Sequence, residues 1–136
     1  MKKVTLTFYG YTWEEYAFQI SSLKGLFVVY KGRLDNEGYV DIKEVLYVGY
    51  HNGIIELYDD NIIDSLKQYM DFGERLFLSY AEVPSDTDGE TISSLISKAV
   101  HPIYKKEKKE KIKNSSEQIT ITCKGNCELI PQEIIG

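Results

Sequence analysis

Apolar and polar residues alternate at the start of the chain, as they do in a half-buried strand. Every second side chain of residues 2–9 is apolar, with threonines between them: Val4, Leu6 and Phe8. From Thr12 the apolar spacing becomes helical, and Glu15 stands three residues after Thr12 as in a capping box. The pattern predicts a strand over residues 2–9 and a helix that Thr12 caps.

Two longer apolar runs follow, and a polar segment rich in turn-forming residues separates them. The first run covers residues 26–30 after Gly25, and the second covers residues 39–50. Both are rich in valine and tyrosine, residues that favour strands. The polar segment 31–38 contains an Asp-Asn pair and a glycine, which is typical of a hairpin turn. We therefore expect a hairpin of two strands.

The second half of the chain alternates between helical and strand patterns. A helix is expected over residues 54–70, with an interruption or a new cap at residues 59–61 and an end at Gly73. Its expected buried face consists of Ile55, Ile62, Leu66 and Tyr69. A strand over residues 75–83 and a helix over residues 90–100 should follow. The helix is expected to take its cap from Asp86 or Asp88 and to end at His101-Pro102.

The C-terminal part contains a lysine run, a further strand over residues 118–123 and an apolar tail over residues 129–135. The element order predicts an α/β protein, a small single-domain sandwich with a central mixed sheet flanked by helices. We expect a single domain over residues 1–136. Its expected parts are an N-terminal strand and helix, a core, a lysine-rich linker, and a C-terminal strand and tail: residues 1–24, 25–104, 105–117 and 118–136.

Charge is unevenly distributed along the chain. The net charge is −5, but residues 105–113 hold six lysines and two glutamates, so the other residues carry −9. An acidic body repels nucleic-acid backbones, and only Arg33 and Arg75 can clamp a phosphate with a guanidinium. No apolar run reaches the roughly 20 residues of a membrane span. We expect a soluble, cytoplasmic protein without membrane contact.

The two apolar strand segments contain the triplets Gly25-Leu26-Phe27 and Tyr47-Val48-Gly49. Together with the later segments LFLSYAEV and HPIY, they resemble the GIY-YIG nuclease superfamily over about residues 25–130. The resemblance implies that the two triplets lie on adjacent strands of one sheet. It also implies a phosphodiester-cleaving ancestor that used tyrosines, an arginine and a divalent cation held by a glutamate.

Several family positions have changed in this chain. Phe27 stands where the first tyrosine belongs, and Leu57 stands where the resemblance places the arginine. The glutamate position falls on Ile92 or Ser93, and Lys105 replaces an asparagine. The neighbouring hydroxyl of Tyr30 should point to the opposite face of the strand from Phe27. The resemblance therefore predicts a degenerate catalytic site.

Four further residues can be interpreted either as catalytic or as structural. Tyr47 and His51 near the second triplet, with Glu56 and Glu90, could form a displaced catalytic set using Mg²⁺ or Mn²⁺, with Glu90 as the metal ligand. Tyr47 can equally be a core tyrosine, and His51, which has no evident partner in the sequence, a turn residue. Glu90 can equally be a first-turn glutamate that favours the helix dipole.

Two further sets of residues are weaker candidates. Six lysines could contact nucleic acid, although without interleaved aromatic residues they suit a solvated segment better: Lys105, Lys106, Lys108, Lys109, Lys111 and Lys113. Cys123 and Cys127 lack nearby histidines and form a poor zinc pair, so we expect them to be reduced.

Three hypotheses on function follow. The first is a catalytically inactive GIY-YIG-like domain without a cofactor that binds a protein partner or itself, through strand edges and tyrosines. The second is a divergent metal-dependent DNA endonuclease, and the third is a nucleic-acid-binding module that uses the lysine run. The degenerate family positions favour the first.

Overall fold

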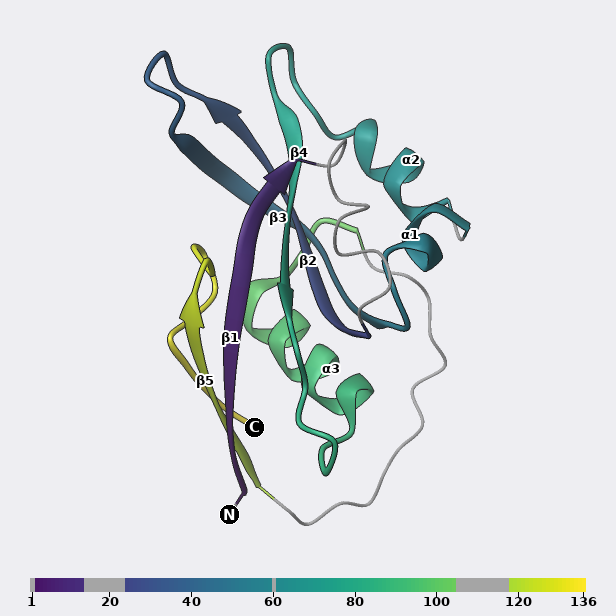
Figure 1. The fold of residues 1–136 in the computed structure, drawn as a ribbon, viewed down its shortest axis with the longest axis vertical. Coiled ribbons are helices and arrows are strands. Elements are labelled where there is room, and N and C mark those ends of the chain that lie inside the picture. The colour runs from purple at the N-terminus through teal and green to yellow at the C-terminus, as the bar shows by residue number, and fades with distance from the viewer. Residues whose placement is uncertain (1, 14–23, 60, 105–117) are drawn as a thin grey trace.

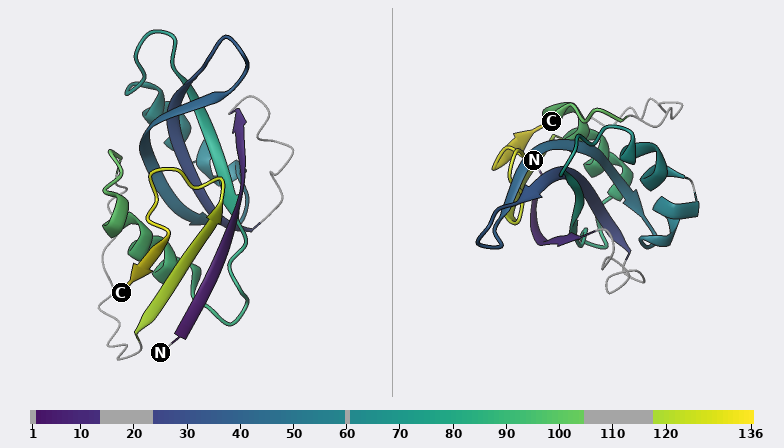
Figure 2. Two further views of the ribbon diagram at one scale, coloured as in Figure 1. Left: turned by 90° about the vertical axis from the view of Figure 1, so that its left-hand side faces the viewer. Right: turned by 90° about the horizontal axis from the view of Figure 1, so that it is seen from above.

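A computed structural model describes residues 2–13, 24–59, 61–104 and 118–136. Six strands form one mixed sheet in the order β3-β2-β4-β1-β5-β6. Strand β1 pairs in parallel with β5, and all other neighbours are antiparallel. Figures 1 and 2 show that the sheet curls strongly. The expected α/β class with a mixed sheet is confirmed, whereas the relationship to GIY-YIG nucleases stays a prediction.

The N-terminal strand is longer than the sequence pattern predicts. Strand β1 runs over Lys2–Trp13, so Thr12 and Trp13 belong to it rather than to the start of a helix. The pairing of β1 with β4 shifts register between Tyr9 and Thr12, which lets the strand continue past Gly10. The prediction that Thr12 caps a helix is therefore wrong, and the rest of the expected helix lies outside the described residues.

The two triplet strands form the expected hairpin. Strand β2 covers Gly25–Leu34 and β3 covers Val40–His51, with Phe27 directly opposite Gly49. Strand β2 also pairs with β4, which covers Arg75–Ala81 and is shorter than expected by two residues. Both β2 and β4 are covered on their two faces, which explains their uninterrupted apolar runs.

The helix expected over residues 54–70 consists of two short helices. Helix α1 covers Ile55–Asp59 and α2 covers Ile62–Lys67, with Asn61 in a left-handed conformation between them. This is the interruption that the Asp-Asp-Asn segment suggested. Ile62 and Leu66 are buried as expected, but two details are wrong: Ile55 is half exposed, and the helix ends at Lys67 rather than at Gly73. Gly73 instead adopts a positive φ of 82° in the turn before β4.

Helix α3 follows the sequence expectation closely. It covers Gly89–Val100, and the Asp88 carboxylate caps it by accepting hydrogen bonds from the Glu90 amide and the Thr91 hydroxyl. His101, with a φ of 50°, ends the helix before Pro102. In the C-terminal part, β5 covers Ile119–Gly125, and the expected tail contains a sixth strand, β6, over Glu133–Ile135.

The sheet divides the buried side chains into two clusters. Helix α3 covers one face of the sheet, where alternate residues of β1, β2 and β5 pack with Ile92 and Ile96. Helices α1 and α2 cover the other face over β2, β3 and β4. Tyr30 belongs to the α3 cluster and Phe27 to the opposite cluster, so the prediction that they point to opposite faces is confirmed. Within the described residues, no helix has the length and apolar character of a membrane span.

Candidate functional site

The end of β3 brings Tyr47 and His51 into contact across a glycine. Residues two apart on a strand share a face, so Tyr47, Gly49 and His51 project on the same side. The Tyr47 hydroxyl and His51 Nε2 are 2.7 Å apart. A Cβ atom added at Gly49 would overlap the Tyr47 hydroxyl and would lie 2.7 Å from His51 Nε2. The glycine of the triplet thus provides the space for this hydrogen bond.

Glu56 extends the contact to a chain of three residues. Its carboxylate lies 3.2 Å from His51 Nδ1, and it also accepts a hydrogen bond of 2.8 Å from the Asn52 amide. A carboxylate can only accept, so Nδ1 carries the proton. In the neutral imidazole, Nε2 is then the acceptor for the Tyr47 hydroxyl. The Glu56 carboxylate of α1 therefore binds the end of β3 through His51 and through the Asn52 amide.

The chain of Tyr47, His51 and Glu56 is buried at its tyrosine end. Tyr47 is 3% exposed and His51 is 7% exposed, whereas the Glu56 side chain is 38% exposed. The rings of Phe27 and Tyr104 lie 6.4 Å from His51 and 5.9 Å from Tyr47, respectively, between ring centroids. Solvent therefore reaches the carboxylate, whereas the rings of Tyr47 and His51 pack against other aromatic rings.

Tyr47, His51 and Glu56 follow one another as hydroxyl, imidazole and carboxylate, as in a nucleophilic triad, but here the carboxylate is the exposed group and the hydroxyl is buried. In such triads a carboxylate orients an imidazole, which removes a proton from a hydroxyl that faces the substrate. Here the hydroxyl of Tyr47 faces the core and the carboxylate of Glu56 faces solvent. The three groups as arranged satisfy one another's hydrogen bonds and fix the junction of β3 with α1.

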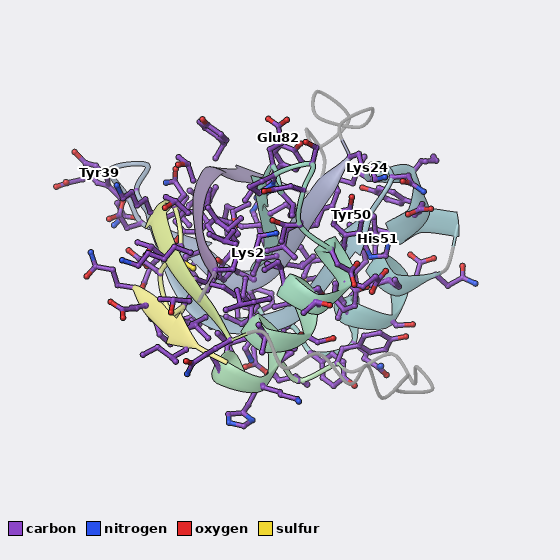
Figure 3. The ribbon with its side chains drawn as sticks, turned by 90° about the horizontal axis from the view of Figure 1, so that it is seen from below. Lys2, Lys24, Tyr39, Tyr50, His51 and Glu82 are labelled. Atoms are coloured by element: carbon purple, nitrogen blue, oxygen red, sulfur yellow. The ribbon has the colours of Figure 1, made fainter. Side chains whose placement is uncertain are left out.

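The structure brings together three of the four candidate residues. Glu90 lies in the first turn of α3 on the opposite face of the sheet, where the neighbouring Gly89 packs against the ring of Tyr50. Figure 3 shows Tyr50 and His51 next to each other at the end of β3, with Lys24 nearby. The Lys24 ammonium lies 5.6 Å from the centroid of the Tyr50 ring. Glu90 is exposed, as expected for a glutamate that favours the helix dipole.

The sequence interpretation of His51 as a turn residue without a partner is wrong. His51 is the last residue of β3 and contacts both a hydroxyl and a carboxylate. The alternation of tyrosine, glycine and histidine at positions 47, 49 and 51 predicts that they share a face of the strand, which the first contact requires. The role of Gly49 as a spacer is the feature that the sequence interpretation missed.

The positions that the resemblance assigns to catalytic groups are filled by buried side chains. Phe27 and Leu57 are fully buried in the cluster under α1 and α2. Ile92 is fully buried in the cluster under α3, and Ser93 is 6% exposed. Phe27 and Leu57 therefore lie on one side of the sheet, and Ile92 and Ser93 lie on the other.

The remaining candidates are the lysine run and the two cysteines. The six lysines at positions 105–113 lie outside the described residues, so their contact with nucleic acid stays a prediction. Cys123 and Cys127 are free thiols, as expected. In the described ranges, no group of three histidine, cysteine, aspartate or glutamate side chains is placed to hold a metal ion.

Burial raises the pKa of the Cys123 thiol to about 12, with a smaller contribution from Cys127. The folded protein therefore retains a proton that the unfolded chain releases above pH 9, so the free energy of unfolding should fall as the pH rises from 9 towards 12. The expected slope is up to about 1.4 kcal/mol per pH unit. Urea unfolding of wild type and Cys123→Ala at pH 8, 9 and 10 measures it. Equal slopes for both proteins would contradict the assignment to Cys123.

Comparisons of the chain with protein-family models, with curated proteins and with solved structures found no match.

Proposed function

We propose that this protein is a GIY-YIG-like domain without nuclease activity that acts by binding a protein partner. The observation that carries the proposal is the burial of Phe27, Leu57 and Ile92, each with no exposed surface. Phosphodiester cleavage needs groups that reach the transferring phosphate and offset its charge. Buried hydrocarbon side chains at these positions cannot do so, which supports a binding role.

Several features of the sheet edges disfavour docking by strand addition. The middle of β3 accepts hydrogen bonds from the amides of Ile103 and Tyr104. Its pairing with β2 contains two register shifts, and Lys43 and Asp41 form an exposed ion pair along it. Strand β6 at the other edge has only three residues. Bulges, charges and short strands are devices that protect an edge from pairing with another chain, so a partner is better placed elsewhere.

A divergent metal-dependent endonuclease is the second candidate function. The contacts among Tyr47, His51 and Glu56 favour it, because they place a hydroxyl, a base and a carboxylate in sequence. Such an enzyme would need a movement that exposes the Tyr47 hydroxyl. Mg²⁺ or Mn²⁺ would then require a carboxylate close to the phosphate, and Glu56 is the exposed one of this set.

Incubation with supercoiled plasmid and with single-stranded DNA, in Mg²⁺ or Mn²⁺, separates the two candidates. We expect no cleavage above the background of a mock purification. Cleavage that is lost in both Tyr47→Phe and Glu56→Gln would establish the second candidate. Glu90→Gln is the matched control, because Glu90 lies on the other face of the sheet and should leave such activity unchanged.

A further inference from the structure

The loops at one end of the sheet expose two large aromatic side chains. Phe72, in the turn between α2 and β4, is 99% exposed, and Tyr39, in the hairpin between β2 and β3, is 69% exposed. Figure 1 and the left view of Figure 2 place these loops at the same end of the molecule, as two separate projections, and Figure 3 shows Tyr39 projecting from the body. Complete exposure of a phenylalanine leaves a large apolar area in water.

The turn that carries Phe72 is held in place by several polar contacts. The Asp71 amide donates to Glu74 Oε1 at 2.6 Å, and the Glu74 amide donates to the Asp71 carbonyl at 3.0 Å. Lys31 of β2 lies within 4 Å of both carboxylates. Phe72 is therefore presented by an ordered turn, and little backbone entropy remains to be lost when a partner covers it.

The hairpin that carries Tyr39 is fixed in a similar way. The Asp35 carboxylate accepts hydrogen bonds of 2.9 Å from the amides of Glu37 and Tyr39. The Asp35 amide donates to the Tyr39 carbonyl, also at 2.9 Å. Tyr39 is thus presented on a closed turn.

Both arginines of the chain lie at this end, although lysines make up the other fourteen basic residues. Arg75 begins β4 opposite Gly32, and Arg33 is the next residue of β2. A Cβ atom at Gly73 would lie 3.6 Å from Arg33 Nη1, so the guanidinium of Arg33 borders the turn of Phe72. Aromatic residues and arginine are the residues that protein interfaces favour, and lysine is depleted there.

The charges around the two aromatic residues are of both signs. Exposed carboxylates at Glu37 and Asp71 flank the two exposed arginines. A surface of one sign repels a second copy of itself, whereas a twofold axis can place the cations of such a mixed surface against the carboxylates of its copy. The surface is therefore electrostatically suited to self-association.

We propose that this loop end, defined by Arg33, Tyr39, Phe72 and Arg75, joins two copies of the chain in a twofold dimer. The inference rests on the proposed binding function and names its partner. Two copies of Phe72 and Tyr39 would bury about 700 Å² of aromatic surface. Even with the arginines this is a small interface, of the size of weak, transient contacts rather than of permanent dimers. We therefore expect a weak dimer, with a Kd on the order of 10–100 μM.

Sedimentation equilibrium of the full chain between about 5 and 500 μM tests the dimer. The wild-type mass should rise with concentration from 15.7 kDa towards twice that value. Phe72→Ser and Arg33→Ala should each weaken association at least tenfold, with unchanged circular dichroism because both side chains are exposed. Ile135→Ser is the matched control, since Ile135 is 63% exposed on β6, and it should associate as wild type does.

Three results would overturn the proposal: a monomer at the highest concentration, association that persists in Phe72→Ser, or equal loss in Ile135→Ser. The DNA-cleavage assay decides the proposed function independently. A monomer that does not cleave DNA would remove only the dimer, and a dimer that cleaves DNA would remove only the inactive assignment.

Discussion

Replacing Gly49 with alanine is expected to lower the free energy of unfolding by about 3 kcal/mol. The added Cβ would overlap the Tyr47 hydroxyl and crowd His51 Nε2, and both side chains are buried. One of them must therefore move, which breaks their hydrogen bond and leaves a buried polar group unsatisfied. Urea denaturation followed by circular dichroism measures the loss.

A double-mutant cycle with Tyr47→Phe tests the cause of this loss. Phenylalanine removes the hydroxyl and with it the hydrogen bond that Gly49→Ala would break, while Cζ of the ring stays 2.6 Å from the added Cβ. Gly49→Ala should therefore still destabilise the Tyr47→Phe protein, but by about 1 kcal/mol less than it destabilises wild type. Gly38→Asn is the control, because Gly38 has no heavy atom within 4 Å of an added Cβ and asparagine tolerates its positive φ. Additive effects of the two substitutions would show that Gly49 does not serve as a spacer.

The sequence predicts this part of the structure only where the relevant contact is local. Alternation along β3 places Tyr47, Gly49 and His51 on one face, so their shared orientation follows from the strand alone. The contact of His51 with Glu56 depends in addition on the turn after β3, where Gly53 has a φ of 151°. The helix that the capping-box pattern at Thr12 predicts does not form there, because pairing with β4 extends β1 through Trp13 and overrides the local preference.

Long-range pairing explains the other differences between expectation and structure. Strand β6 has three residues, too few to be distinguished from an apolar tail, and it is a strand because Ile134 pairs with Ile121 of β5. The burial of Leu57 depends on how α1 and α2 pack on the sheet, which periodicity in a five-residue helix cannot specify. By contrast, the cap at Asp88 and the end at His101 are local, and both were predicted.

The largely buried ammonium group of Lys31 lies among three carboxylates next to the turn that carries Phe72. Its ammonium lies 3.4 Å from Glu44, 3.9 Å from Asp71 and 3.8 Å from Glu74, and it donates to the Tyr69 carbonyl. The side chains of Lys31 and Glu74 are only 14% and 5% exposed. No sequence pattern predicts the cluster, because its members come from β2, β3 and the turn before β4.

Lys31→Met is expected to lower the free energy of unfolding by about 2–3 kcal/mol, because it leaves the Glu74 carboxylate buried without its cation. The exposed carboxylates of Glu44 and Asp71 add little to this value. Lys43→Met is the matched control: its ion pair with Asp41 is shorter, at 2.6 Å, but both side chains are about half exposed. It should cost about 0.5 kcal/mol or less.

Urea unfolding of both variants therefore decides whether burial or distance sets the strength of an ion pair in this protein. A larger loss in Lys43→Met than in Lys31→Met would contradict the burial argument. Because Lys31 also holds the turn of Phe72, Lys31→Met should weaken self-association in the sedimentation experiment while Lys43→Met should not. Weakened association with an intact Phe72 would show that the order of the turn, and not only its aromatic ring, contributes to the proposed interface.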